Sequence, residues 1–283
     1  MNQQIINLYD EYTHRPLSRQ VFLKELGKLA GGTAAAMALL PLLESNYAIA
    51  ARTGSEDLFT ETVEYPGVPG TMNAYIARPK EDKKYPAVVV IHENRGRTAH
   101  IEDVARRVAA AGYLAIAPDA LSAMDKKPAN EDEARQLFSE LKAENNVQNF
   151  INAFPYLQTR KDFNGKTGCV GFCWGGAMAN SLAVAVPELD AAVSFYGRQP
   201  NAEDTSKIKA AIQLHYAGVD ERVNAGIHAY EKALTDAGVR FEIYQYEGAQ
   251  HAFHNDTSGA RYNEAAAKRA WGRTITFFNK YLS

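Results

Sequence analysis

The segment from Gly171 to Gly176 has the residue types and the spacing of a nucleophile held on a sharp turn. It reads Gly-Phe-Cys-Trp-Gly-Gly and lies between an apolar run and a helix-like run. Such a turn strains the backbone at its centre and brings the positions two before and two after into close approach, where glycine is needed. At the start of the following helix, unpaired N–H groups favour a thiolate and later an oxyanion. The pattern predicts covalent catalysis by Cys173; the alternative is a buried cysteine in a strand-to-helix turn.

An activated nucleophile needs a base and a carboxylate that orients the base, and two later loops offer them. Asp220 and His251 each follow a strand-like run. Because the carboxyl ends of parallel strands meet at one edge of a sheet, both side chains are expected beside Cys173. The chain order nucleophile, acid, histidine fits this type of turn. Asp220 has a second interpretation as a helix N-cap and His251 as a surface loop residue, and their near competitors are Glu221 and His254.

An oxyanion needs a second backbone donor, and the loop after the apolar run 86–92 is the expected place. We assign this donor to the N–H of Asn94, paired with the N–H of Trp174. Glu93 would then lie within reach of the nucleophile. The alternative for Glu93 is a loop carboxylate paired with one of the two arginines that follow it.

The elements that must position these residues alternate between strand-like and helix-like segments. The strand-like runs cover 59–65, 71–78, 86–92, 113–117, 168–172, 191–195, 211–216 and 240–246. The helix-like runs cover 101–111, 131–142, 147–157, 175–186, 225–237 and 265–281. The first two strands are joined by a hairpin signal at 66–70. This alternation predicts an α/β fold, one domain over 56–283 with a mostly parallel sheet and helices on both faces.

Composition excludes several classes of protein. The chain has 283 residues, 46% hydrophobic and 23% charged, with a net charge of −2. These values exclude a disordered chain, a collagen-like repeat and a disulfide scaffold. The chain has no excess of basic residues, so nothing in its charge points to a nucleic-acid partner. The two cysteines, Cys169 and Cys173, lie too close together to join distant segments. Cys169 falls inside a strand and is expected in the core.

Residues 1–55 form a separate, leader-like segment with a polar, helix-like start. The apolar stretch 29–40 is too short to span a bilayer, so no stable membrane span is expected. The run Ser18 to Lys24 resembles a twin-arginine signal in which Gln20 replaces the second arginine, and residues 48–51 resemble a small-residue cleavage site. These features predict periplasmic export. The alternative is a cytoplasmic protein that retains this segment as a helix packed on the domain or on a neighbouring subunit, where it offers a dimer arm.

Over about residues 56–283 the sequence resembles the dienelactone hydrolase family, a cysteine branch of the α/β-hydrolase fold. The resemblance is carried by His92-Glu93-Asn94-Arg95-Gly96, Ala117-Pro118-Asp119, Gly171-Phe172-Cys173-Trp174-Gly175-Gly176, Phe195-Tyr196-Gly197, Gly218-Val219-Asp220 and His251-Ala252-Phe253. It implies that Cys173 is the nucleophile, His251 the base and Asp220 the orienting acid. It also implies that Glu93 contacts the resting thiol and controls its deprotonation.

The sequence departs from this family where the substrate carboxylate is bound. The family has one arginine after the Pro-Asp segment and another after the histidine, and neither neighbourhood contains one here. Arg95, Arg198 or Arg222 can take their place. Aromatic residues beside the expected site, Tyr196 and Phe253, are expected to line a substrate pocket or to belong to the core.

These residues predict hydrolysis of a small-molecule ester or lactone through a thioester, with no cofactor. Two alternatives come from other classes of protein. One is a non-catalytic binder or sensor of small molecules on a hydrolase scaffold. The other is a metal site made by His251 and His254 with His92 or Glu93.

Overall fold

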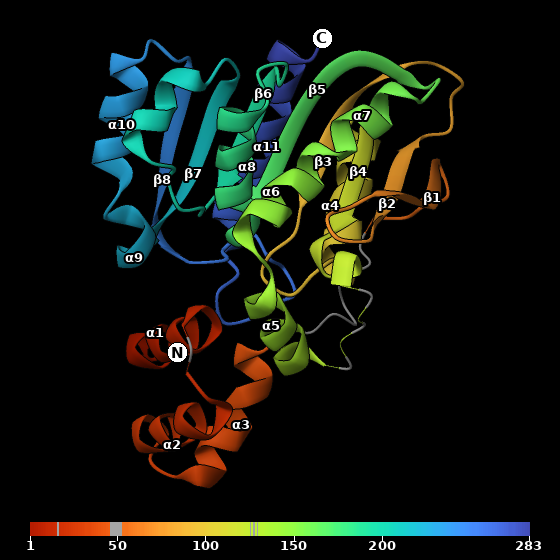
Figure 1. Cartoon of the computed structure of the whole chain (residues 1–283). Helices are drawn as coiled ribbons and strands as arrows, with labels where there is room; N and C mark the ends of the chain where they lie inside the picture. The colour runs from red at the N-terminus through yellow and green to blue at the C-terminus, as the bar shows by residue number, and fades with distance from the viewer. Residues whose placement is uncertain (16, 46–52, 125, 127, 129) are drawn as a thin grey trace.

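The computed structural model describes residues 1–15, 17–45, 53–124, 126, 128 and 130–283. One eight-stranded sheet runs through it in the order β1-β2-β4-β3-β5-β6-β7-β8 (Figure 1). The strands are β1 (Leu58–Pro66), β2 (Thr71–Pro79), β3 (Tyr85–Ile91), β4 (Leu114–Asp119), β5 (Phe163–Phe172), β6 (Ala191–Phe195), β7 (Ala211–Val219) and β8 (Phe241–Gln250). Strands β3 to β8 are parallel, whereas β1 and β2 form an antiparallel hairpin that joins β4. The predicted mostly parallel sheet is confirmed.

Both faces of the sheet are buried because alternate side chains of a strand point to opposite sides. In β3, Val89 and Ile91 belong to one apolar cluster and Val88 and Val90 to the other. Helices α6 (Ala143–Ile151), α7 (Ala153–Gln158), α8 (Trp174–Ala185) and α10 (Ile227–Asp236) cover the first face. Helices α4 (Ala99–Ala110) and α11 (Glu264–Tyr281) cover the second. Helix α5 (Glu131–Glu140) lies near the carboxyl ends of the strands (Figure 1).

Two of the predicted helices differ from the observed ones: the first is divided and the second is shorter. The run 147–157 is split between α6 and α7 at Asn152, because Pro155 has no N–H to donate to the carbonyl of Ile151. The run 225–237 begins later, at Ile227, and a separate short helix α9 (Glu221–Asn224) precedes it.

The N-terminal segment forms three helices, α1 (Gln3–His14), α2 (Arg19–Ala30) and α3 (Thr33–Leu43). They share an apolar cluster of their own that includes Tyr12, Phe22 and Leu26. Figure 1 shows them beyond the carboxyl ends of the strands, with α1 nearest to the sheet. The amide of Asn94 donates a hydrogen bond to the carbonyl of Thr13 over 2.8 Å. In this structure the segment packs on the domain; the predicted cleavage site at 48–51 lies outside the described residues.

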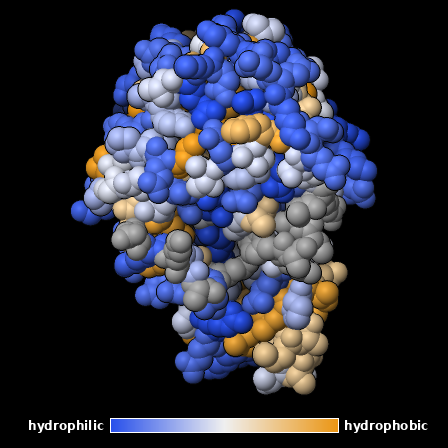
Figure 2. Space-filling view, turned by 90° about the vertical axis from the view of Figure 1, so that its right-hand side faces the viewer, coloured by the Kyte–Doolittle hydropathy of each residue, from blue (hydrophilic) through white to orange (hydrophobic). Residues whose placement is uncertain are grey.

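Large apolar side chains are exposed on two of these helices, α2 and α3. Figure 2 shows them at the lower end of the molecule, and they include Val21, Leu29, Met37 and Leu42. Within the described part of the chain, no single helix is long and apolar enough to cross a membrane. Only α2 and α3 together reach the required length, and they are bent by 109° to one another.

Candidate active site

Cys173 occupies the sharp turn between the end of β5 and the start of α8. Its backbone angles, φ 57° and ψ −113°, lie in a region that residues other than glycine rarely adopt. A Cβ on Gly175 would come within 2.5 Å of the carbonyl oxygen of His92, and a Cβ on Gly171 would overlap Gly175 itself. The glycines are therefore required by the close approach of the backbone, as the spacing predicts.

His251 and Asp220 meet at the carboxyl ends of β7 and β8. The Nδ1–H of His251 donates to Oδ2 of Asp220 over 2.5 Å, and Oδ1 of Asp220 accepts from the N–H of Val223 over 3.2 Å. Asp220 is therefore both the N-cap of α9 and the partner of the histidine. Burial alone would raise the pKa of Asp220, but the hydrogen bond from His251 and the charge of Arg222 lower it below its usual value. Glu221 is exposed and does not compete for this place.

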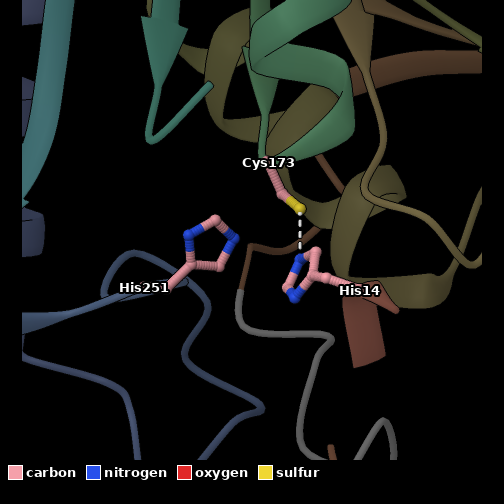
Figure 3. Close-up of side chains that lie close together, drawn as sticks. All are labelled: His14, Cys173 and His251. Atoms are coloured by element: carbon pink, nitrogen blue, oxygen red, sulfur yellow. Dashed lines mark hydrogen bonds between the residues drawn. The ribbon is translucent and has the colours of Figure 1, made fainter. Parts of the chain in front are cut away.

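Figure 3 shows a second histidine that sequence reasoning did not include. The Nε2 of His14, at the end of α1, lies 3.0 Å from Sγ of Cys173. The rings of His14 and His251 stand edge to face, 4.7 Å apart between centroids. The Nε2 of His251 has no hydrogen-bond partner among the described residues. In this structure the thiol is therefore contacted by the histidine of the N-terminal helix, with His251 beside it.

Asp10, one turn earlier on α1, holds the other side of the His14 ring. Its backbone carbonyl oxygen lies 2.8 Å from Nδ1 of His14, within hydrogen-bond distance, and its carboxylate Oδ1 lies 3.1 Å from the same nitrogen. Burial disfavours a charge on His14, but the thiolate of Cys173 and the hydrogen bond with Asp10 raise its pKa above the usual value. Burial likewise works against the Asp10 carboxylate, yet the charges of His251 and His14 hold its pKa well below the usual range. The signal in the sequence is Asp-x-x-x-His, which puts both side chains on one helix face.

Glu93 lies in the loop after β3 and lines a small cavity together with Cys173. Its Oε2 accepts a hydrogen bond from the amide of Asn255 over 2.7 Å, while its Oε1 has no hydrogen-bond partner among the described residues. Arg97 pairs with Glu102 instead, so it is not the partner of Glu93. The guanidinium of Arg261, which is nearly fully buried, lines the same cavity and supplies a positive charge there.

The two expected oxyanion donors lie on either side of this turn. Trp174 is the first residue of α8, where N–H groups have no partner within the helix. Asn94 follows β3, and its side-chain amide is used to hold Thr13.

A cavity of about 940 Å³ opens beside Cys173. Its wall includes Phe138, Trp174, Tyr196, Arg198, Arg222 and His251. Arg95 lines the small cavity of Glu93 instead and hydrogen bonds to Asn94. For Phe253 the second of the two expected positions is observed: it is fully buried, with ring centroids 5.4 Å from Tyr196 and 5.0 Å from Tyr246. It therefore belongs to the core rather than to the pocket wall.

The metal site suggested by His251, His254 and His92 is not assembled. The ring of His254 stacks on Phe172 at 4.9 Å, and burial together with the charge of His100 holds its pKa well below the usual value. The Nε2 of His92 accepts from the N–H of Ala120. Another group does lie close enough to share a metal ion in the described part of the chain. Its members are His14, Cys173 and His251, whose ligand atoms all lie within 4.8 Å of one another.

Residues 72–282, which include β2 and all the strands that carry the site, match the Dienelactone hydrolase family. The chain belongs to the dienelactone hydrolase family. A "Putative carboxymethylenebutenolidase" from Saccharolobus solfataricus is 32% identical over 247 residues, which cover 74% of this chain and 94% of that protein. A "Putative hydrolase fragment YghX" from Escherichia coli is 48% identical over 107 residues, covering 36% of this chain and 92% of the fragment.

Solved structures of dienelactone hydrolases have the same fold. The "Putative Dienelactone Hydrolase" from Klebsiella pneumoniae superimposes with a TM-score of 0.69 at 28% identity, covering 79% of this chain and 99% of that one. The dienelactone hydrolase from Anabaena variabilis gives a TM-score of 0.62 at 20% identity, covering 81% and 100%. The protein therefore has the α/β-hydrolase fold, and the family makes it a hydrolase of carboxylic esters or lactones.

Proposed function

We propose that this dienelactone hydrolase relative cleaves its ester or lactone by a Cys173–His251–Asp220 triad through a thioester. The observation that carries the proposal is the orientation of His251. Its Nδ1 donates to Asp220 over 2.5 Å, and its Nε2 has no hydrogen-bond partner in the described part of the chain. The ligand atoms of His251, Cys173 and His14 all lie within 4.8 Å of one another. A carboxylate that fixes one ring nitrogen leaves the other as a base, and catalytic hydrogen bonds often tighten only when substrate binds.

The reaction has two steps. The thiolate of Cys173 attacks the carbonyl carbon, and the C–O bond to the leaving group then breaks to give the thioester. Water, deprotonated by His251, attacks the thioester and releases the acid and the thiolate. The N–H groups of Asn94 and Trp174 stabilise the oxyanion in both steps, an effect worth about 3–4 kcal/mol for a single donor in a comparable site.

Glu93 and Arg261 adjust the charge around the sulfur. Glu93 has one carboxylate oxygen without a hydrogen-bond partner in the small cavity that Cys173 also lines, and Arg261 lies in the same cavity. A carboxylate there opposes the thiolate, whereas the guanidinium favours it. In our proposal Glu93 limits the reactivity of the resting thiol.

The nucleophile and the cavity together define a class of substrate. A thiolate leaves a tetrahedral intermediate easily, so an ester with a poor leaving group reverts to starting material. Enol lactones and aryl esters, whose leaving groups are stabilised, are therefore the preferred substrates. The cavity of about 940 Å³ admits such molecules, and Arg198 and Arg222 in its wall can bind a carboxylate of the substrate.

Hydrolysis of p-nitrophenyl acetate tests the nucleophile. We expect Cys173→Ala to reduce kcat/KM by at least about 10³-fold, because the covalent path is lost. Cys169→Ala is the matched control, since Cys169 is buried in β5 and lies outside the cavity. Full activity of Cys173→Ala would contradict the proposal.

A further inference from the structure

The N-terminal helix α1 brings a second histidine–carboxylate pair to the nucleophile. His14 Nε2 lies 3.0 Å from Sγ of Cys173, and Asp10 Oδ1 lies 3.1 Å from the other ring nitrogen. Figure 3 shows the rings of His14 and His251 beside the sulfur. Each has a carboxylate near its Nδ1, but Asp220 Oδ2 accepts directly from His251 over 2.5 Å, whereas the nearest oxygen to His14 Nδ1 is the backbone carbonyl of Asp10 at 2.8 Å. Two oriented histidines therefore face one thiol, whereas a triad needs one.

We propose that His14, oriented by Asp10, holds Cys173 as a thiolate in the resting enzyme and protonates the leaving group, so that His251 is left to activate water. This inference rests on the function proposed above, because it assigns a second catalytic residue to the same nucleophile. It also makes the N-terminal segment part of the active site.

Several contacts fix the His14 ring in place. The carbonyl of Thr13 accepts from Asn94 over 2.8 Å, and the guanidinium of Arg261 lies 4.9 Å from the centre of the Tyr9 ring. On the next turn, the guanidinium of Arg135 lies 3.9 Å from the centre of the Tyr12 ring. These contacts join α1 to the loops after β3 and β8 and to α5. A ring held in this way is placed for proton transfer.

The charges around the sulfur favour an ion pair with His14. The titratable and charged groups that face this cluster come from every element around it: His14, Asp10 and Tyr9 from α1, Glu93 and Arg95 after β3, Tyr196 after β6, Asp220 and Arg222 after β7, and His251 and Arg261 after β8. Of the cations, His14 alone has a hydrogen bond to the sulfur among the described residues. An imidazolium within hydrogen-bond distance of a sulfur stabilises a thiolate by its charge, and the Asp10 carboxylate stabilises that imidazolium.

The protons balance over one turnover. The thiolate forms the C–S bond, the C–O bond breaks, and the leaving oxygen takes the proton of the His14 imidazolium. In the second step His251 removes a proton from water, the hydroxide forms the new C–O bond, and the C–S bond breaks. The proton that His251 took from water returns to His14 and restores the ion pair, and the carboxylic acid product releases its own proton to solvent as it ionises.

Alkylation of the full-length protein by iodoacetamide tests this division of roles without any ester substrate. The thiolate attacks the methylene carbon, the C–S bond forms and iodide leaves; mass spectrometry of the Cys173 peptide gives the rate at each pH. We expect His14→Gln to move the midpoint of the pH profile upward by about one unit or more, which is about tenfold slower labelling at low pH. Asp10→Asn moves the midpoint in the same direction by less.

The two histidines are predicted to differ. His251→Gln keeps the wild-type labelling profile but loses ester hydrolysis, and His228→Gln, on the exposed side of α10, changes neither. A wild-type profile in both His14→Gln and Asp10→Asn would overturn the proposal. A pH profile that shifts only in His251→Gln would also overturn it. So would His14→Gln labelling that becomes faster at every pH with an unchanged midpoint, because α1 would then only shield Cys173 from the reagent. The ester hydrolysis activity of Cys173→Ala is measured separately, so failure of the proposed triad can be distinguished from failure of the role proposed for His14.

Discussion

His251 donates a hydrogen bond to Asp220 over 2.5 Å, although 31 positions and three secondary-structure elements, α9, α10 and β8, separate them. They meet because β7 and β8 are parallel neighbours whose carboxyl ends lie at the same edge of the sheet. Asp220 uses its other oxygen to cap α9, so the fold and the proposed chemistry share one carboxylate.

This double use of Asp220 separates activity from stability. Asparagine still caps a helix, so Asp220→Asn is expected to change the free energy of unfolding by less than about 1 kcal/mol. It nevertheless leaves the histidine without an anionic partner, and kcat is expected to fall by about 10²–10⁴-fold. Asp220→Ala is expected to lose the activity and about 0.5–2 kcal/mol of stability as well. Ester hydrolysis and urea denaturation measure the two effects, with the exposed Glu221→Gln as control; an active Asp220→Asn would count against the triad.

The glycines of the nucleophile turn give a prediction about stability. Gly175→Ala places a Cβ within 2.5 Å of the carbonyl of His92, and backbone cannot move aside as a flexible side chain does. We expect a loss of about 1–3 kcal/mol or more. Gly272→Ala is the matched control in α11, where a Cβ meets nothing within 4 Å, and it is expected to gain about 0.5–1 kcal/mol. Equal unfolding midpoints for the two variants would contradict the close packing of the turn.

The sequence predicted the sheet, and it located the three residues of the proposed triad, because local signals sufficed. Buried strands appear as continuous apolar runs, and the ends of those runs located Asp220 and His251. The glycine spacing located Cys173. The apolar periodicity of the run 147–157 continues across its break, so it does not reveal that Pro155 divides this helix.

The role of His14 could not be predicted in this way. Its contact with Cys173 spans 159 positions and depends on how α1 packs on the loops of the sheet. The composition of residues 1–55 also favoured interpretation as a leader. The sequence left Phe253 between the pocket and the core for a similar reason: proximity in sequence to His251 does not tell which way a side chain of the loop points, and here it is buried in the core.

A buried ion cluster away from the nucleophile gives a pH prediction. Asp256 lies 3.1 Å from Nδ1 of His100 and 2.6 Å from a guanidinium nitrogen of Arg107. Burial would raise its pKa, but these two partners lower it well below the usual value. A lowered carboxyl pKa contributes stability that is present above about pH 4 and is lost as the pH falls further.

We therefore expect the free energy of unfolding of the wild type to fall more steeply between about pH 4 and pH 2 than that of Asp256→Asn. Urea denaturation across this range measures the slope. Asp82→Asn, at an exposed position, is the control and keeps the wild-type slope. Parallel curves for wild type and Asp256→Asn would show that the carboxylate does not carry this dependence.

The central claim is that Cys173 carries the acyl group, and trapping that group tests it most directly. In His251→Ala the water is no longer activated, so the thioester formed from p-nitrophenyl acetate is expected to accumulate. Mass spectrometry of the quenched protein then shows one added acetyl group, located by peptide mapping on Cys173 and removed by hydroxylamine. An acetyl group on any other residue, or turnover of the ester by Cys173→Ala with no adduct at all, would contradict the account.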